Sequence, residues 1–349
     1  MGPQLLVLVT LVVTLACSDK TPGGTPETVS AGGGVSGRRQ TLLRNLDTPW
    51  SIAFLPDGRM LFTERAGRVS MVENGSRRTI GTIDVVQQGE AGLLGIAVDP
   101  DFDKNRYIYL YYTHPAGNRV ARFVMTEQGS LANETVLIDQ IPNAIFHNGG
   151  RIRFGPDGRL YITTGDAQKP ELAQDTRSLA GKILRIEKDG VIPRDNPFRN
   201  AVWAYGLRNP QGIDWHPATG SMYASDHGPN RMDEVVLIER GGNYGWPSTC
   251  DQKGNWIPAI RCYEEFTLAP CGIAFHGDQL FVAALRGAQV RQLSLPGDKL
   301  TQESAFLTDL GRIRDVVAHD GWLYVATSNL DGRGRVASGD DQIVRIRLD

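Results

Sequence analysis

The sequence has no excess of charge of one sign. Its 349 residues include 37 Lys and Arg against 39 Asp and Glu, so the net charge is −2. A chain this close to neutral creates no global field that would draw it to nucleic acid or to an acidic membrane surface. We therefore expect no nucleic-acid partner. The length allows one large domain or two ordinary ones, with enough apolar residues for a core.

Long hydrophobic runs are also missing. The apolar stretch Leu5–Ala16 is too short to cross a bilayer as a helix and has the length of a signal-peptide core. We predict a signal peptide over residues 1–17, a flexible linker over 18–38 and one folded domain over 39–349. Export to the periplasm follows. The box "TLAC" resembles a lipoprotein cleavage site, so Cys17 either carries a lipid that tethers the protein to a membrane or ends an ordinary signal peptide.

Cysteine is scarce, and no pair has the CxxC spacing of common metal sites. Export would place Cys250, Cys262 and Cys271 in an oxidising compartment, where one pair at most can close. We predict a Cys250–Cys262 disulfide, because both residues lie in one loop-like insertion. Metal ligation by these thiols is the weaker alternative.

Glycine is abundant, with 40 residues, and one unit recurs along the chain. Each copy is an apolar strand, a turn of Asp, Gly and Pro, and a second strand of aromatic and β-branched residues, and a third strand follows most copies. Six copies predict an all-β fold, a six-bladed β-propeller, rather than a β-helix or a sandwich. The segment Arg39–Leu46 has no partner of its own and is expected to close the ring as the outer strand of the last blade.

Hairpin geometry divides the ring into two faces. Residues just before the first strand of a unit and just after its second strand lie on the same face, because the two strands are antiparallel. We call this the mouth face, and it holds the polar residues. The opposite face carries the repeated turns, so we interpret His216, His276 and His319 as turn residues.

The mouth face contains His147 and His227, together with Arg208, Arg286, Arg312 and Arg314. An imidazole that titrates near neutrality can act as a general base, although His147 alone fits a structural role equally well. Converging arginines repel one another unless an anion offsets them. We therefore expect a ligand with several carboxylates or a phosphate. The alternative is that some arginines pair with Glu90, Asp226 or Asp315.

A calcium site is predicted in the segment that begins at Asp226. Gly228 and Pro229 can turn backbone carbonyl oxygens outward, and hard cations bind such oxygens together with carboxylates. Asp233 and Glu234 can serve the same ion or a second one.

Five motifs follow one another along residues 40–349: "GLLGIAVDPDF", "HNGGRIRFGPDG", "GLRNPQG", "HGPNRMDE" and "GGNYGWP". In these motifs the chain resembles the quinoprotein glucose/sorbosone dehydrogenase family, whose members include soluble aldose sugar dehydrogenases. The resemblance implies a propeller that binds the tricarboxylate pyrroloquinoline quinone (PQQ) and calcium, and that oxidises a sugar substrate.

The resemblance also implies roles for individual residues. His147 matches the catalytic base, and Arg208 and Asn209 match residues that contact the cofactor, with Arg208 polarising the quinone oxygens. The other matches are listed by role: Arg312 and Arg314 for cofactor carboxylates, Gly228 and Pro229 for the cofactor's calcium, Glu234 and Tyr244 for a further calcium.

Four positions depart from the family pattern. Glu90 replaces a glutamine that contacts the cofactor, and Phe146 replaces an acidic residue beside the base. Arg286 replaces a lysine and His227 a glutamine, both in the cofactor-binding set. The two glycines after His147 are interpreted as room for a flat cofactor. These departures put glucose in doubt as the preferred sugar.

The leading hypothesis is a PQQ- and calcium-dependent aldose dehydrogenase that passes electrons to a separate acceptor, as a monomer or a dimer. A non-catalytic propeller that binds a protein or glycan at the mouth is the main alternative, since fold alone does not decide function. A calcium-dependent hydrolase is a third, but it would need acidic ligands from several blades, and the acids here cluster in one.

Overall fold

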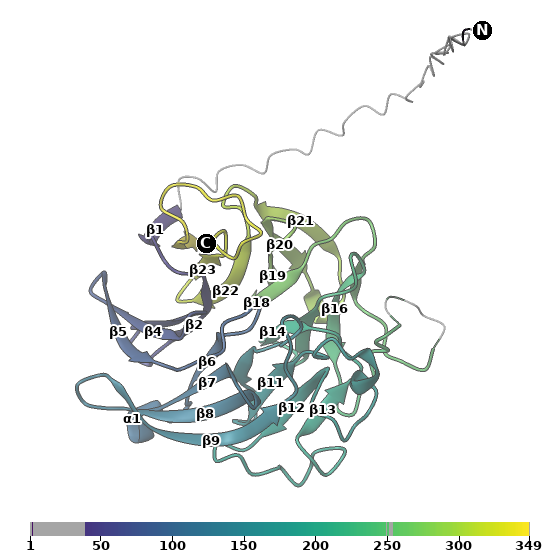
Figure 1. Ribbon diagram of the computed structural model, residues 1–349, viewed down its shortest axis with the longest axis horizontal. Helices are drawn as coiled ribbons and strands as arrows, with labels where there is room; N and C mark the ends of the chain where they lie inside the picture. The colour runs from purple at the N-terminus through teal and green to yellow at the C-terminus, as the bar shows by residue number, and fades with distance from the viewer. Residues whose placement is uncertain (1, 3–38, 249, 251–253, 349) are drawn as a thin grey trace. The chain divides into compact units, whose positions relative to one another are not determined.

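The computed structural model describes Gly2, residues 39–248, Cys250 and residues 254–348. The predicted signal peptide, Cys17 and the linker therefore lie outside the described residues, apart from Gly2. Six four-stranded antiparallel sheets follow one another around a ring (Figure 1), which confirms the predicted six-bladed propeller. No helix in the described ranges is long and apolar enough to cross a membrane.

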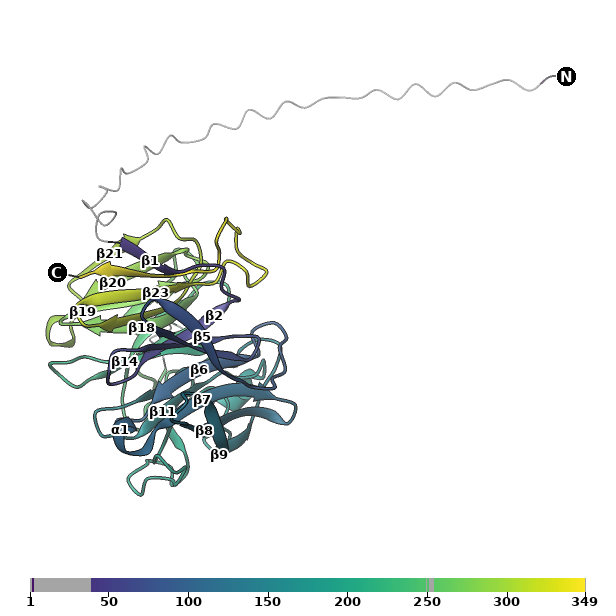
Figure 2. The same ribbon diagram turned by 90° about the vertical axis from the view of Figure 1, so that its left-hand side faces the viewer.

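The blades are built from consecutive strands. The first three are β2 (Pro49–Phe54), β3 (Met60–Glu64), β4 (Arg68–Glu73) and β5 (Ser76–Thr82); β6 (Leu93–Val98), β7 (Tyr107–His114), β8 (Gly117–Met125) and β9 (Leu131–Ile141); and β10 (Ile152–Phe154), β11 (Leu160–Thr164), β12 (Lys182–Ile186) and β13 (Val202–Tyr205). Figure 2 shows the first two blades from outside the ring.

The next two blades are β14 (Pro210–Trp215), β15 (Met222–Asp226), β16 (Asp233–Ile238) and β17 (Arg261–Tyr263); and β18 (Pro270–His276), β19 (Gln279–Ala284), β20 (Gln289–Ser294) and β21 (Gln302–Leu307). The sixth joins β22 (Ile313–His319), β23 (Trp322–Thr327) and β24 (Ile343–Arg347) to β1 (Arg39–Leu43). Short helical turns are α1 (Phe102–Asn105), η2 (Pro170–Ala173) and η3 (Pro296–Asp298).

Strand β1 pairs antiparallel with β24, with Arg39 opposite Ile346. The prediction that Arg39–Leu46 supplies the outer strand of the last blade is thus confirmed. The pairing joins the two ends of the described chain in one sheet, and it covers an edge of the sixth blade that would otherwise be open.

On the face opposite the mouth face, the hairpin turns of two blades make the same hydrogen bonds. In the first blade Gly58 has φ +85° and its amide donates to the carbonyl of Leu55 (2.9 Å), while Asp57 accepts from the amide of Arg59 (3.1 Å). In the third blade Gly158 (φ +73°) and Asp157 make the same bonds at the same distances. Glycine is needed because the turn passes through the left-handed region.

The three histidines that we interpreted as turn residues lie at hairpin turns. His276 and His319 are the last residues of β18 and β22 and pair with the first residues of the next strands. His216 directly follows β14, and its ring accepts the amide of Ala218 (3.1 Å). The interpretation of all three as turn residues is confirmed.

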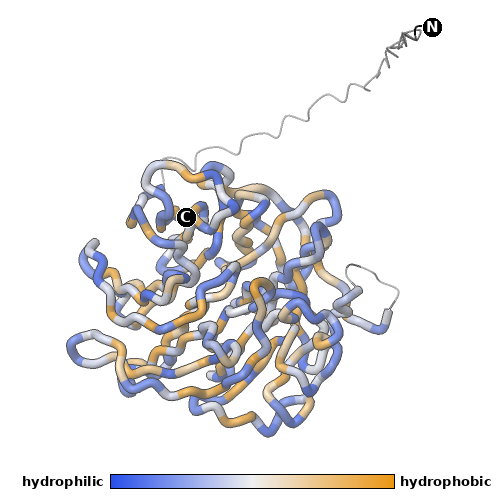
Figure 3. Tube along the Cα trace, viewed as in Figure 1, coloured by the Kyte–Doolittle hydropathy of each residue, from blue (hydrophilic) through white to orange (hydrophobic). Residues whose placement is uncertain are grey.

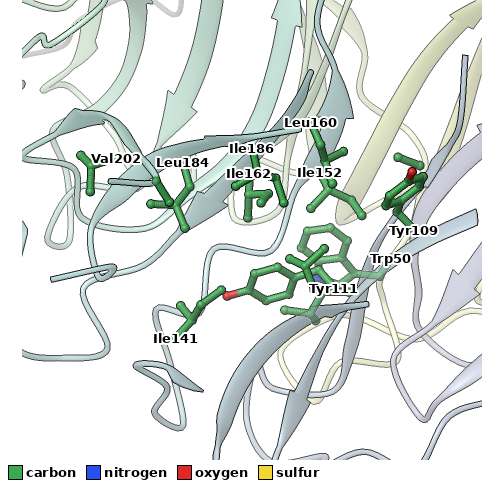
Figure 4. Packing of buried hydrophobic residues seen from close by; sticks show 14 residues of the cluster. Trp50, Tyr109, Tyr111, Ile141, Ile152, Leu160, Ile162, Leu184, Ile186 and Val202 are labelled. Carbon is green, nitrogen blue, oxygen red and sulfur yellow. The ribbon is translucent and has the colours of Figure 1, made fainter. Parts of the chain in front are cut away.

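The core lies between neighbouring blades. Each buried cluster joins adjacent sheets, for example Leu61 and Met71 of the first blade with Leu110 and Phe123 of the second. Figure 3 shows hydrophobic and hydrophilic residues alternating along the strands. Trp50 lies beside Tyr111 among aliphatic side chains of the second and third blades (Figure 4).

A buried ion pair crosses the middle of the ring. Arg151 precedes β10 and Asp315 lies in β22, so the pair joins the third and sixth blades, which stand opposite each other. Their atoms Nη2 and Oδ1 are 3.0 Å apart, and Arg151 also lies over the ring of Trp50, 4.5 Å from its centre. The inner strands are therefore tied together beneath the mouth face.

Candidate active site

The mouth face is assembled as hairpin geometry predicts. Pro49 is paired with Glu64, Pro210 with Asp226, and Ile313 with Thr327, so the start of each first strand lies beside the end of the second. The residues that flank these positions approach one another from different blades.

His147 lies in the segment that leads into β10, with φ +63°, an uncommon conformation for a residue other than glycine. Its Nδ1 is 2.7 Å from Oδ1 of Asp166, which follows β11. The other carboxylate oxygen of Asp166 accepts a hydrogen bond from Nε1 of Trp246 at 2.8 Å. The His147 side chain is 17% exposed, whereas that of Asp166 is fully buried.

This arrangement selects one form of the His147 ring. A carboxylate can only accept a hydrogen bond, so Nδ1 carries a proton, and in the neutral form of the ring Nε2 has the lone pair. Nε2 has no hydrogen-bond partner among the described residues. A buried carboxylate that orients an imidazole in this way is the arrangement a general base requires. The geometry favours a chemical role for His147 over a purely structural one.

Both the backbone amide and the side chain of Arg208 donate hydrogen bonds. Its amide donates to Asp226 (2.8 Å), and its Nη1 donates to the carbonyls of His227 (3.2 Å) and Gly228 (3.0 Å). The guanidinium lies over the ring of Trp246, 5.2 Å from its centre. Trp246 thus contacts the partner of the base and the neighbouring cation at once.

Asn209 links the same segment to His147. Its amide donates to Asp226 (2.6 Å), and its Oδ1 accepts from the amide of Gly149 (3.0 Å). Its Nδ2 donates to Glu90 at 3.2 Å. Burial raises the pKa of Asp226 to about 6, against the lowering effect of the two amides that it accepts. Asn209 therefore braces the backbone around the base.

Glu90 lies in the turn before β6. One carboxylate oxygen accepts from the amide of His147 (3.3 Å) and from Asn209, and the other is 3.3 Å from Nη1 of Arg333. Burial opposes ionisation of Glu90. The electrostatic effects of His227, Arg314 and Arg333, together with the His147 amide, outweigh burial and lower its pKa.

A cavity of about 530 Å³ opens between the fourth, fifth and sixth blades, and the side chains of Glu90, His227, Arg286, Arg312 and Arg333 are among those that line it. Such a volume is within the range of small-molecule sites. Burial lowers the pKa of His227 to about 4, so its ring adds no positive charge near neutral pH. The positive charge of this cavity comes from arginines.

The predicted arginines do not pair with the acids considered from the sequence. Arg312 forms an ion pair with Asp331 (2.7 Å), Asp315 pairs with Arg151, and Glu90 pairs with Arg333. Arg314 donates to Gln211 at 2.5 Å. Arg286 is exposed on the wall of the cavity.

Three arginines in this region carry a buried Nε atom without a hydrogen-bond partner in the described part of the chain: Arg65, Arg208 and Arg314. Buried N–H groups are normally satisfied, and unsatisfied ones call for a ligand or another explanation. Burial, with the nearby charge of Arg314, also lowers the pKa of Arg65. These atoms are donors that an anion can use.

The comparisons with known proteins show the family of the chain. The Glucose / Sorbosone dehydrogenase family description matches residues 46–336. The chain belongs to this family. It is 33% identical to aldose sugar dehydrogenase YliI of Escherichia coli over 363 residues, which cover 92% of this chain and 96% of that protein.

Two solved structures of family members have the same fold. The PQQ-bound aldose sugar dehydrogenase of Streptomyces coelicolor is 35% identical, with a TM-score of 0.85, over 88% of this chain and 96% of that one. The apo form of the soluble aldose sugar dehydrogenase of Escherichia coli is 31% identical, with a TM-score of 0.79, over 89% and 99%.

The predicted metal ligands of this glucose/sorbosone dehydrogenase family member are less complete. The carbonyl of Gly228 accepts from Arg208, and that of Pro229 accepts from the amide of Arg231 (2.6 Å). Both oxygens thus already have donors, so they make no metal site by themselves.

Glu234 and Tyr244 lie together elsewhere in the fourth blade. Both line a cavity of about 40 Å³, while the hydroxyl of Tyr244 bonds the carbonyl of Leu237 and the amide of Glu239. Burial, together with the neighbouring Asp226, raises the pKa of Glu234 to about 8. A bound cation would stabilise the ionised form of such a carboxyl group, whereas burial and acidic neighbours oppose ionisation.

The predicted disulfide between Cys250 and Cys262 is present, which confirms that pairing over metal ligation by these thiols. Cys271 is a buried free thiol, 3.6 Å from Nε2 of His227. Burial raises its pKa to about 12, so it remains protonated at neutral pH.

The interpretation of the glycines after His147 needs correction. A Cβ on Gly149 would meet the carbonyl of Thr163 at 2.7 Å, and one on Gly150 would meet the side chain of Leu94 at 2.6 Å. These residues are small because neighbouring strands of the protein approach them, so the structure gives no reason to link them to a flat ligand.

Four residues of the site had no role in the sequence analysis: Asp166, Trp246, Arg65 and Arg333. Asp166 follows a second strand on the mouth face, so its position was a usable signal. Trp246 belongs to the motif "GGNYGWP", but motif membership does not tell which atoms its indole contacts. Arg333 lies in a loop outside the repeat.

Proposed function

We propose that this protein oxidises aldose sugars at the anomeric carbon to lactones, using PQQ. The observation that carries the proposal is the Asp166–His147 pair, because the His147 amide is bonded to Glu90, which lines the cavity with the arginines. Membership of the glucose/sorbosone dehydrogenase family and the likeness to a PQQ-bound aldose sugar dehydrogenase support it.

The residues fit an anionic cofactor with several carboxylates. The unsatisfied Nε atoms of Arg208 and Arg314 are donors, and Arg286 and Arg312 add charge on the cavity wall. Asn209 and His227 complete the cofactor-binding set. Bound PQQ supplies a quinone that accepts a hydride, two electrons and one hydrogen nucleus, from the anomeric carbon.

His147 performs the proton transfer. Its Nε2 takes the proton of the anomeric hydroxyl while the C–H bond of that carbon breaks, and a C=O bond forms to give the lactone. Asp166 holds the ring in the required form and stabilises the positive charge that appears on it. Arg208 stabilises negative charge that develops on the cofactor's oxygens. The electrons then leave to a separate acceptor.

Calcium belongs to the proposal with a narrower role. Gly228 and Pro229 do not form a site alone, so an ion there would need oxygens from the cofactor as further ligands, and we derive no step through it. Glu234, with the segment of Tyr244, is the stronger cation site because its carboxyl group is buried.

The proposal includes export to the periplasm, with Cys17 as the candidate lipid anchor. The near-neutral charge of the whole chain gives no support for a nucleic-acid partner. All residues of the proposed site belong to one chain, so the proposal does not depend on whether the protein is a monomer or a dimer.

The test is reconstitution of the purified protein with PQQ and calcium, followed by assay of a panel of aldoses with an artificial electron acceptor. We expect a quinone absorbance that sugar bleaches, and one lactone for every two electrons that the acceptor takes up. PQQ binding without oxidation of any aldose would refute the dehydrogenase assignment. Failure to bind PQQ would favour the non-catalytic propeller that binds a protein or glycan.

A further inference from the structure

Glu90 and Arg333 meet at the mouth from distant parts of the chain. Glu90 precedes the second blade, and Arg333 lies in the loop between β23 and β24 of the sixth. Nη1 of Arg333 is 3.3 Å from Oε1 of Glu90. The same guanidinium lies over the ring of Phe146, 4.8 Å from its centre. One cation therefore contacts both an acid and an aromatic ring beside the base.

Glu90 and Phe146 are two of the departures from the family pattern. An acid stands at 90 in place of a glutamine, and an aromatic ring stands at 146 in place of an acid. Arg333 contacts both replacements. Glu90, Phe146 and Arg333 are therefore parts of one arrangement.

The position of Glu90 in the cavity makes its pairing with Arg333 important for ligand binding. Its side chain is only 14% exposed, and it lines the same cavity as Arg286 and Arg312. Its other oxygen is already occupied by the His147 amide and Asn209. Without Arg333, a carboxylate would face the cavity with one unpaired oxygen. Such a charge repels an anionic ligand more strongly in a desolvated site than in water.

We propose that Arg333 is a positioning residue that neutralises Glu90 and thereby allows the cavity to accept the tricarboxylate PQQ. Arg333 acts through Glu90 and makes no essential bond to the cofactor. This inference rests on the proposed function, because it concerns the affinity for PQQ.

The test is a double-mutant cycle on the apo-protein, with PQQ itself as the probe and binding followed by tryptophan fluorescence quenching in the presence of calcium. Arg333→Met should weaken PQQ binding at least 10-fold. Glu90→Gln should bind PQQ as tightly as wild type or more tightly. The double variant should return to within about threefold of Glu90→Gln, because the charge that Arg333 offsets is gone.

Two further variants separate charge pairing from other effects. Arg333→Lys keeps the charge and should bind within about threefold to fivefold of wild type. Arg194→Met removes the same charge from an exposed position that does not line the cavity and should change affinity much less than Arg333→Met. Thermal melting of each variant checks that the loop change leaves the propeller folded.

Each outcome decides the matter. If Arg333→Met weakens binding equally with Glu or Gln at position 90, Arg333 contacts the cofactor or only orders the loop, and the inference is wrong. Equal losses in Arg333→Met and Arg194→Met would also overturn it, because the effect would then be one of general charge. A wild-type protein that binds no PQQ would instead refute the proposed function.

Discussion

The first and third blades have the same hairpin turn but different polar residues on the mouth face. Pro56–Gly58 and Pro156–Gly158 form the same turn with the same bonds. At the other end, the first blade places the buried Glu64 against Arg68 (2.7 Å), whereas the third places Asp166 against His147. Both acids are fully buried, yet one pairs with the cation of Arg68 and the other orients the ring of His147. The repeat conserves the scaffold, and the loops between strands carry the chemistry.

The largest effect is expected from two histidines on opposite faces. His147→Ala should lower kcat by about 10²- to 10⁴-fold with little change in melting temperature, because it removes a general base. His216→Ala should leave kcat nearly unchanged and lower the melting temperature. It removes an acceptor for the Ala218 amide, at a cost of about 1–3 kcal/mol in the free energy of unfolding. Steady-state kinetics and thermal melting are measured on both variants. A His147→Ala enzyme of normal activity would contradict the proposed role of His147 as the general base.

The two buried acids give the next comparison. Asp166→Asn should lower kcat by roughly 10²-fold, because an amide can no longer accept from both Nδ1 of His147 and Trp246 in the same way. Glu64→Gln weakens the ion pair with Arg68, so it should reduce stability by about 1–3 kcal/mol and leave kcat near that of wild type. Chemical denaturation and kinetics on both proteins test this contrast. Equal kinetic effects would mean that Asp166 has no particular connection with the base.

Two glycines of the third blade provide a steric comparison. A Cβ on Gly165 would lie 1.9 Å from the carbonyl oxygen of His147, so Gly165→Ala should displace the base and lower kcat roughly 10-fold. A Cβ on Gly158 meets nothing within 4 Å, and Gly158→Ala should cost only about 1 kcal/mol of stability, from its positive φ. The ratio of kcat loss to stability loss in the two variants is the measurement. A similar ratio in both would show that backbone position at the mouth does not limit catalysis.

The smallest effect concerns calcium. Calcium at 100 times its Kd should raise the melting temperature of wild type by about 5 °C, because it binds only the folded site. Glu234→Gln should abolish this rise, whereas Glu239→Gln, an exposed acid of the same blade, should keep it. Differential scanning fluorimetry with and without EDTA provides the comparison. An unchanged rise in the Glu234 variant would place the calcium site elsewhere.

The fold was predictable because it depends on local patterns. Strand alternation occurs in all six units and an Asp–Gly turn in three of them, and antiparallel pairing alone places His147 and Arg208 on one face. The contacts between loops were not predictable in the same way. Arg333 reaches Glu90 across 243 residues of sequence, and Trp246 reaches Asp166 across 80, only because the ring brings distant blades together. No short-range pattern records such distances.

The pairing of β1 with β24 has a consequence for how the molecule is made. The strand that leaves the ribosome first among the described elements bonds to the one that leaves last, with Gln40 and Arg345 separated by 305 positions. Contacts at such long range form late and slowly. The sixth blade therefore stays incomplete, and the ring stays open, until synthesis has passed β24.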